Sequence, residues 1–311
     1  MASPDTTNAD QGAGDAQPQV TYETLDDGRI ARIWLNRPHA QNAQSRTLLV
    51  QLDEAFGRAE ADDTVRVVIL AARGKNFSAG HDLGSEEAML ERQPGPHQHP
   101  TFTINGGSRE PIAERTYLQE WHYFFENTRR WRDLRKITIA QVQGNAISAG
   151  LMLIWACDLI VASDDAKFSD VVTVRMGMPG VEYYAHPWEF GARKAKELLL
   201  TGDSIDADEA YRLGMVSKVF PRAELEEKTL EFARRIAERP TMGALLVKDS
   251  VNAAADAMGF TEALRHAFHI HELGHAHWAA ANENRFPVGL PPDVPDWRTL
   301  GAPKLARRDE P

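Results

Sequence analysis

A wholly apolar helix behind a glycine-rich turn is the feature that most constrains how this chain can fold. The stretch GNAISAGLMLIWACDL runs from residue 144 to residue 159, and the residues that follow Gly150 are apolar on every side. A helix without a polar face must be covered all round, so it belongs in the interior of a layered domain. Its first turns carry no acid or base, yet the turn before it places two backbone amides where a negative group could meet them.

Segments typical of strands lie on both sides of this buried helix. RIARIWL at 29–35 alternates polar and apolar residues, and VRVVIL at 65–70 is a β-branched run of the buried-strand type. Shorter apolar runs predict further strands at 137–142, 158–162 and 167–168.

Helical patterns alternate with these strands and then dominate. Ser45 can cap a helix that ends near residue 60, and an amphipathic helix is expected over 112–135. Beyond residue 187 helices are expected at about 188–201, 206–214, 222–238, 240–257 and 260–283. This order predicts an α/β core followed by a helical C-terminal region.

The same patterns divide the chain into four parts. Residues 1–19 are small and polar, lack the features of a signal peptide, and are expected to form a disordered tail. The core spans 20–215, the helical region 216–285, and a proline-rich extended tail 286–311. Residues 84–112 within the core have little periodicity and predict a long loop.

The composition limits the possible partners and the compartment. A net charge of −10 argues against binding to nucleic acid, which needs a basic face. No apolar run approaches the ~18 residues that span a bilayer, so no membrane partner is expected. The single cysteine, Cys157, excludes an intrachain disulfide and favours a reducing, cytoplasmic compartment. Its apolar neighbours would not activate it as a nucleophile.

Four collinear segments resemble the crotonase (enoyl-CoA hydratase/isomerase) superfamily over roughly residues 20–285. They are LNRPHAQNAQ at 35–44, FSAGHDL at 77–83, the stretch VQGNAISAGLMLIWACDLIVASDDAKFS at 142–169, and MGMPGVE at 176–182 with the segment 191–221 behind it. The resemblance implies a ClpP/crotonase-like spiral of ββα turns with a helical C-terminal trimerisation region. It also implies an acyl-CoA substrate, no cofactor other than the CoA of that substrate, and a homotrimer or homohexamer.

By the same resemblance, two backbone amides form an oxyanion hole for the thioester oxygen. The donors would be His81 and Ala149, and such donors stabilise the charge of an enolate or a tetrahedral intermediate. The alternative is that the glycines of these loops serve only tight turns. Contacts with CoA or the thioester would come from Ala40, Gln41, Ala79, Gly80, Asp82, Leu83 and Gly150. Asp82 could instead cap the next turn of the chain.

The chain departs from the family pattern at the two glutamates that hydratases of the family use. Those positions are Met152 and Val172 here, and neither side chain can act as an acid or a base. Glu182 is our first candidate for a displaced general base, and Asp170 is the second. The imidazole of His81 could also move a proton, or could simply pack. Tyr183 and His186 could complete a polar pocket.

This departure leaves several reactions open. Isomerisation, C–C bond hydrolysis and thioester hydrolysis would all use the oxyanion hole with a displaced acid or base. A non-catalytic acyl-CoA binder is an alternative from another class.

A histidine-rich helix supplies a competing motif. HELGH contains His271, Glu272 and His275, the zincin pattern with two imidazoles one turn apart. An extended motif would need glycine at 278 and histidine at 281, where Trp278 and Ala281 stand, and no glutamate follows at a suitable distance. A catalytic zinc needs three protein ligands, so we expect no metal and disfavour a zinc peptidase.

Overall fold

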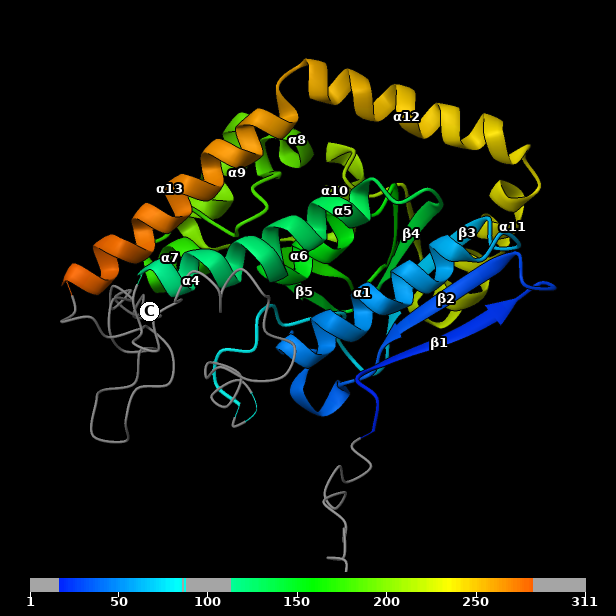
Figure 1. Cartoon of the computed structure of the whole chain (residues 1–311), viewed down its shortest axis with the longest axis horizontal. Helices are drawn as coiled ribbons and strands as arrows, with labels where there is room; N and C mark the ends of the chain where they lie inside the picture. The colour runs from blue at the N-terminus through cyan, green and yellow to red at the C-terminus, as the bar shows by residue number, and fades with distance from the viewer. Residues whose placement is uncertain (1–16, 86, 88–112, 282–311) are drawn as a thin grey trace, which may run out of the picture.

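Two β-sheets form the framework of the protein (Figure 1). The computed structural model describes residues 17–85, 87 and 113–281. The larger sheet has the order β1-β2-β3-β4-β6-β9, in which β1 and β2 are antiparallel and the other neighbours are parallel. Its strands are β1 (Val20–Leu25), β2 (Ile30–Leu35), β3 (Val67–Ala72), β4 (Ile137–Val142), β6 (Leu159–Ser163) and β9 (Lys218–Phe220).

The smaller sheet contains β5 (Asn145–Ile147), β7 (Lys167–Ser169) and β8 (Ser204–Asp206). Strand β5 follows β4 along the chain, and β7 follows β6, so successive turns of the chain add one strand to each sheet. This geometry is a spiral of ββα turns, as predicted. The loops between the two sheets are therefore stacked beside one another.

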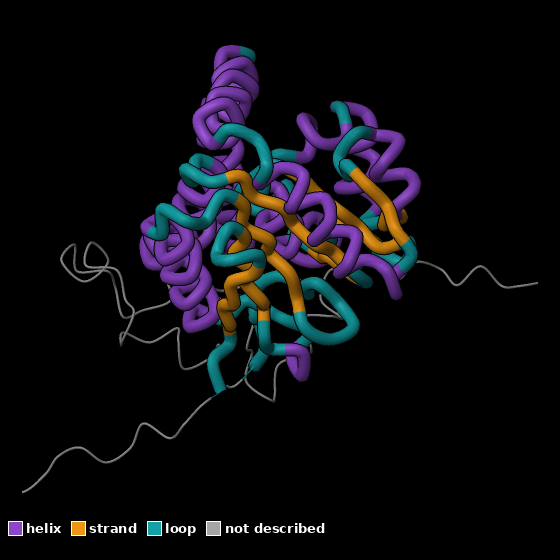
Figure 2. Tube along the Cα trace, turned by 90° about the vertical axis from the view of Figure 1, so that its right-hand side faces the viewer, coloured by secondary structure: helices purple, strands orange, loops and turns teal. Residues whose placement is uncertain are grey.

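Helices cover both sides of the strands (Figure 2). Helix α6 (Ala149–Trp155) is buried along its whole length, as its apolar sequence predicts. Helix α1 (Arg46–Ala61) begins where the Ser45 side chain accepts a hydrogen bond from the Leu48 amide at 3.1 Å. Shorter helices follow the second sheet: α7 (Val172–Met176), α8 (His186–Phe190), α9 (Ala192–Thr201) and α10 (Ala207–Leu213).

The helix expected over 112–135 is divided by a π-helical turn. It consists of α4 (Ala113–Glu120), the π turn (Trp121–Glu126) and α5 (Asn127–Arg132). The C-terminal helices are α11 (Leu225–Ala237), α12 (Thr241–Ala257) and α13 (Phe260–Ala281). In Figure 1, α12 runs along the outside of the molecule, and α13 returns to lie beside α4.

The sequence missed four strands, β1, β5, β8 and β9. Strand β1 pairs with β2 through a turn at Asp26, Asp27 and Gly28, all of which have positive φ. The other three have only three residues each, too short for a periodic pattern. The predicted tails and most of the predicted 84–112 loop lie outside the described residues.

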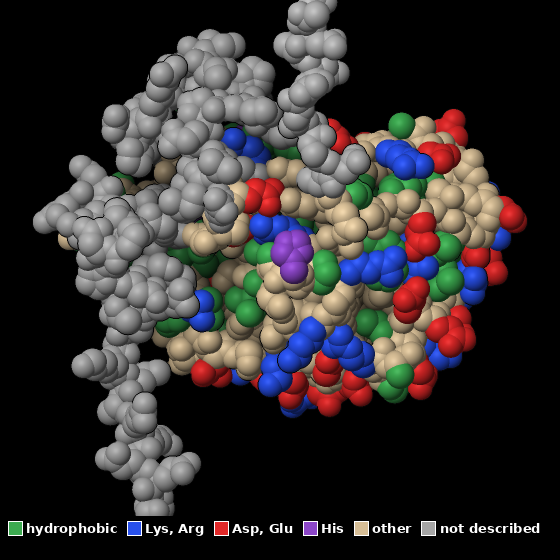
Figure 3. Space-filling view, turned by 90° about the horizontal axis from the view of Figure 1, so that it is seen from below, with side chains coloured by type: hydrophobic (Ala, Val, Ile, Leu, Met, Phe, Trp, Pro, Cys, Tyr) green, Lys and Arg blue, Asp and Glu red, His purple; other side chains and the backbone are tan. Residues whose placement is uncertain are grey.

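The described helices include none that is both long and apolar enough to cross a membrane. On the face seen in Figure 3, acidic and basic side chains are interspersed, and the described residues form no broad basic patch there.

Candidate active site

The two loops that carry the predicted oxyanion-hole donors are locked together. Ser78 pairs with Ala146 in an isolated β-bridge, and the Ile147 amide donates to the Ser78 carbonyl oxygen at 3.0 Å. A Cβ on Gly80, which has φ +93°, would lie 2.9 Å from the Ile147 carbonyl oxygen and 3.3 Å from the Ala149 nitrogen. The backbone at Gly80 therefore passes directly beside the Ala149 amide.

The backbone amides of His81 and Ala149 make no hydrogen bond within the described part of the chain. The bridge between Gln44 and His81 uses the Gly80 carbonyl and the Asp82 amide, which leaves the His81 amide out of the ladder. Ala149 is the first residue of α6, so its amide has no partner within the helix. Ser148 has φ 48° and makes the sharp turn into that helix.

The predicted CoA-contacting residues lie around these loops. Ala40 ends a short 3₁₀ turn, and the Gln41 carbonyl accepts a hydrogen bond from the Ala79 amide at 3.0 Å. A Cβ on Gly150 would lie 2.8 Å from the Ser78 carbonyl oxygen. Leu83 packs against the buried pair Met176 and Met178.

Asp82 has a structural environment of its own. It forms a buried ion pair with Arg37 at 2.5 Å and accepts a hydrogen bond from the Ser85 amide at 3.0 Å. Burial acts to raise the pKa of Asp82, but the hydrogen bonds from Ser85 and Arg37 outweigh it and hold the pKa below its usual value. These contacts match the alternative in which Asp82 caps the following turn.

Glu182 is buried beside the first oxyanion-hole loop. Its Oε2 lies 3.1 Å from Nε2 of His81, and the side chain of Glu182 is only 4% exposed. The His81 ring stacks on Phe124 of the π turn with 3.6 Å between centroids. Nδ1 of His81 is buried and makes no hydrogen bond with any residue that the structure describes. The imidazole of His81 is therefore held by Glu182 and Phe124, while its Nδ1 has no hydrogen-bond partner among the described residues.

Asp170 is bonded on several sides. Its Oδ2 lies 2.9 Å from Nε2 of His186 and 2.9 Å from the Val181 amide, and its Oδ1 accepts from the Val172 amide at 3.0 Å. Burial acts to raise the pKa of Asp170, but the hydrogen bond and charge of His186 outweigh it, so the pKa lies below its ordinary value. Asp170 thus fixes the turn that presents Glu182.

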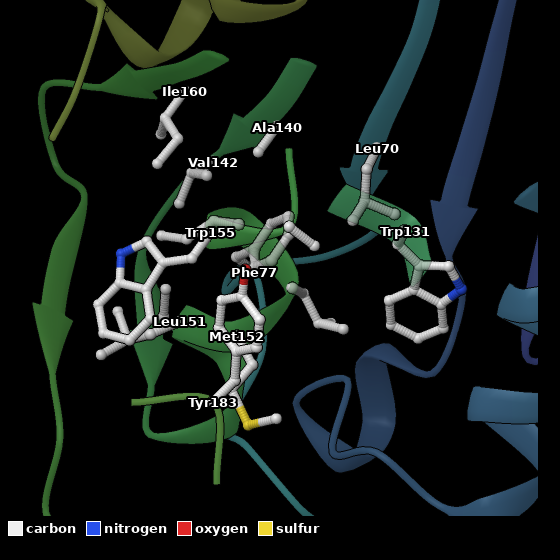
Figure 4. Close-up of a cluster of buried hydrophobic side chains, with 14 of the residues drawn as sticks. Leu70, Phe77, Trp131, Ala140, Val142, Leu151, Met152, Trp155, Ile160 and Tyr183 are labelled. Carbon is white, nitrogen blue, oxygen red and sulfur yellow. The ribbon is translucent and has the colours of Figure 1, made fainter. Parts of the chain in front are cut away.

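The two positions at which the family resemblance predicts glutamates, Met152 and Val172, carry apolar side chains in apolar surroundings. Met152 is 1% exposed and lies among Phe77, Leu151 and Tyr183 (Figure 4). Val172 packs with the Met176 and Met178 pair that also contacts Leu83. Among the described residues the buried Tyr183 hydroxyl has no hydrogen-bond partner, and burial raises its pKa.

The histidines of the HELGH motif face the same region from α13. His271 Nε2 lies 3.7 Å from Glu182 Oε1, and its Nδ1 lies 2.7 Å from the Gly180 carbonyl oxygen. Burial acts to lower the pKa of His271, but the hydrogen bond to Glu120 and the nearby carboxylates raise it to about 9. Burial, reinforced by Glu120 and Glu182, raises the pKa of Glu272 to about 11.

Glu120 is the residue that the sequence interpretation missed. It ends α4, is 6% exposed, and lies against His271 and His275. A signal was present, because Glu120 occupies a helical position between Tyr117 and Phe124, on the apolar face of its helix. A charged residue on such a face requires a buried partner.

Comparisons with known proteins agree with this geometry. The sequence model described as enoyl-CoA hydratase/isomerase matches residues 26–105 and 102–277. A putative enoyl-CoA hydratase, EchA13 of Mycobacterium tuberculosis, is 61% identical over 287 residues, covering 92% of this chain and 89% of that protein. A 4-chlorobenzoyl coenzyme A dehalogenase of Arthrobacter is 33% identical and covers 71% of this chain and 74% of its own.

Solved structures give the same result. The crystal structure of a probable enoyl-CoA hydratase from Mycobacterium smegmatis superposes with a TM-score of 0.74 at 43% identity, over 85% of this chain and 97% of that one. A probable enoyl-CoA hydratase from Mycobacterium thermoresistibile gives 0.75 at 40% identity, over 86% of this chain and all of that one. The crotonase fold predicted from the sequence is confirmed, and the chain is an enzyme of the enoyl-CoA hydratase/isomerase family.

Proposed function

We propose that this enzyme acts on an acyl-CoA thioester and stabilises a negative oxygen with the amides of His81 and Ala149. The main support is that both amides are unpaired in the described chain while their loops are locked side by side. Donors that are fixed in advance lose no freedom as the charge develops, and removing one such donor typically costs on the order of 10²–10³ in rate.

Glu182 is the proposed general base and acid. The His81 Nε2–H donates to one carboxylate oxygen and fixes its orientation, while stacking on Phe124 holds the imidazole ring. The carboxylate removes a proton from the carbon next to the thioester carbonyl. The electron pair of the broken C–H bond moves onto the carbonyl oxygen, where the two amides receive the negative charge. Asp170 is a positioning residue, because it bonds the backbone of the turn and His186.

Isomerisation of a double bond is the reaction that this arrangement supports best. The Glu182 carboxyl returns its proton to the γ-carbon as the electron pair leaves the oxygen, so one group serves as both base and acid. Hydration would need a second group to hold water, and the apolar surroundings of Met152 and Val172 do not supply it. C–C bond hydrolysis and thioester hydrolysis are the next reactions to test.

A panel of acyl-CoA thioesters tests this proposal. We expect turnover of 3-enoyl-CoA to 2-enoyl-CoA, and a fall in kcat on the order of 10²–10⁴ in Glu182→Gln, the range for a general base. The matched control is Glu126→Gln, a partly buried glutamate paired with Arg129, for which kcat should change less than threefold. Saturable CoA-ester binding without turnover would contradict the proposal and support the non-catalytic binder.

The proposal includes a homotrimer or homohexamer in the cytoplasm. The assembly is supported by α12, where only Lys248 is buried. Four of its apolar side chains, and that of Met258 just after the helix, are more than half exposed; the four are Met242, Leu246, Val247 and Val251. Exposed apolar area of this kind usually marks an interface. The location is supported by the single thiol, Cys157.

A further inference from the structure

We propose that Glu120, His271 and His275 form a binding site for a divalent first-row transition metal, with zinc as the first candidate. The three residues come from two helices, α4 and α13, that lie side by side (Figure 1). None of them belongs to the oxyanion-hole loops. The site is proposed from the donor geometry alone and does not depend on the proposed reaction.

The three donor groups are spaced as ligands of one ion. Nε2 of His271 lies 3.0 Å from Nε2 of His275. Glu120 Oε1 lies 3.2 Å from His275 Nε2, and Glu120 Oε2 lies 3.4 Å from His271 Nε2. Two ligands bound at about 2.0–2.1 Å with a tetrahedral angle lie about 3.3 Å apart. Each imidazole faces a different oxygen of Glu120, and one ligand atom from each of the three residues lies within 4.8 Å of the others. The donors are therefore close enough together for one ion to bind all three.

The tautomer of His271 suits a metal ligand. Its Nδ1 lies 2.7 Å from the Gly180 carbonyl oxygen, which can only accept a hydrogen bond, so Nδ1 carries the proton. In the neutral ring the lone pair of Nε2 then points toward Glu120 and His275. A metal-binding histidine usually donates its other N–H to a carbonyl or carboxylate in this way, and that bond orients the ring.

Burial makes an empty cluster costly. Glu120, His271 and His275 are 6%, 3% and 7% exposed, and the Glu182 carboxylate lies next to His271. Two buried carboxylates need positive charge nearby, which is supplied either by a protonated His271 or by a divalent ion. Two imidazole nitrogens that face each other at 3.0 Å need either a shared proton or a common cation.

The sequence offers no third zinc ligand downstream of the HELGH motif. The fold supplies a carboxylate from upstream instead, at the end of α4 where the π turn begins. Glu120 and His271 are 151 positions apart, so no local motif could show it. Three protein ligands leave the fourth position of a zinc ion for water or substrate, as in catalytic sites. Two further buried carboxyl groups lie next to that ligand set, Glu182 beside His271 and Glu272 beside Glu120.

Metal titration of the full-length protein tests the site without substrate. After removal of metals by a chelator, ZnCl₂ is titrated by calorimetry, and the retained metal is counted by elemental analysis. We expect one zinc per chain with a dissociation constant below about 1 µM. His271→Gln and His275→Gln should each weaken binding at least about 100-fold. His277→Gln, an exposed histidine on the same helix, should bind as the wild type does.

Equal zinc binding by the wild type and His275→Gln, or no binding below about 10 µM, would overturn the site. Should the variants unfold by circular dichroism, CoCl₂ added to the wild-type protein decides. Four-coordinate cobalt absorbs visible light far more strongly than octahedral aqueous cobalt, and only the strong spectrum agrees with the proposal. Parallel MnCl₂ and anaerobic FeSO₄ titrations show which ion this donor set prefers. A failed isomerase assay would leave these results unchanged.

Discussion

At the scale of single residues, the buried carboxylates of Asp170 and Glu182, which lie on either side of α7, differ in their hydrogen-bond partners. Asp170 bonds His186 and two backbone amides, so its ionised form is stabilised by fixed partners. Within the described ranges, the partners of Glu182 are two side-chain imidazoles, at 3.1 and 3.7 Å. A carboxylate with few fixed partners can exchange a proton, whereas a saturated one holds the backbone in place. This contrast is why we assign the chemistry to Glu182.

Asp170→Asn should destabilise the protein by about 3–5 kcal/mol, because it removes the charged partner of a buried pair. The folded pKa of Asp170 lies below the ordinary value of 3.8, so its contribution is complete above that pH and is lost as pH falls through the lower pKa. The free energy of unfolding, measured with urea, should therefore fall more steeply between pH 6 and pH 2 for the wild type than for the variant. As a control, Asp203→Asn at an exposed position should give the same dependence of unfolding free energy on pH as the wild type. Parallel curves for the wild type and Asp170→Asn would refute this account.

Cys157 should resist alkylation at neutral pH. Burial, with Asp158 nearby, raises the pKa of its thiol to about 12, in line with the prediction that it is no nucleophile. The thiolate fraction should grow only as pH approaches 12. Iodoacetamide labelling followed by mass spectrometry should give less than a tenth of the rate of free cysteine at pH 8, and the denatured chain is the control. Rapid labelling of the folded protein would contradict the assignment.

At the scale of elements, the helices and strands that could be predicted are those marked by an apolar pattern or by a capping residue. The apolar residues after Gly150 predict the buried helix α6, and Ser45 predicts the start of α1; both are confirmed. The π turn was not predicted, because π turns are rare and the spacing of Tyr117, Trp121 and Phe124 also suits an ordinary α-helix. It places Phe124 against His81, a contact between segments more than 40 residues apart.

The candidate site was predictable only where its residues belong to local sequence motifs. Glu182 and His81 belong to loops with recognisable motifs, whereas their mutual distance depends on how the sheets stack. The ligand role proposed for Glu120 depends on α13 returning to α4, which no local pattern encodes. The oxyanion-hole roles of His81 and Ala149 stay predictions, with geometry in their favour.

Gly150→Ala tests the contact between the two loops. The added Cβ would meet the Ser78 carbonyl oxygen at 2.8 Å, so one loop must move and the two amides separate. We expect kcat to fall on the order of 10²–10³, as for loss of one donor. The control is Gly57→Ala in α1, whose Cβ would meet nothing within 4 Å and should stabilise the helix by roughly 0.5–1 kcal/mol. Unchanged kcat in Gly150→Ala would remove the oxyanion hole from the mechanism.

At the scale of the whole molecule, α12 is the element least explained by a single copy. It lies along the outside in Figure 1, and its apolar side chains are spread over more than one face. A solitary chain would leave these side chains in water at a cost of roughly 25 cal/mol per Å² of apolar area. A second and third copy would remove that cost.

Val247→Glu with Val251→Glu should break the assembly, because it would bury two unpaired charges at the contact. Sedimentation equilibrium should show a mass of three or six chains for the wild type and of one chain for the double variant. Lys228→Glu on α11 should leave the mass unchanged. A wild-type protein that sediments as one chain would refute the proposed assembly.

Helix α13 has one face toward Glu120 and another that is exposed. His271 and His275 point inward to Glu120, while Ile270 and Leu273 on the same turns are 43% and 68% exposed. A neighbouring copy that covers the outer face would also hold the helix against α4. Dilution would separate the copies and loosen α13. Bound zinc should then be released before the chain unfolds, and the zinc content per chain should fall as the protein concentration falls.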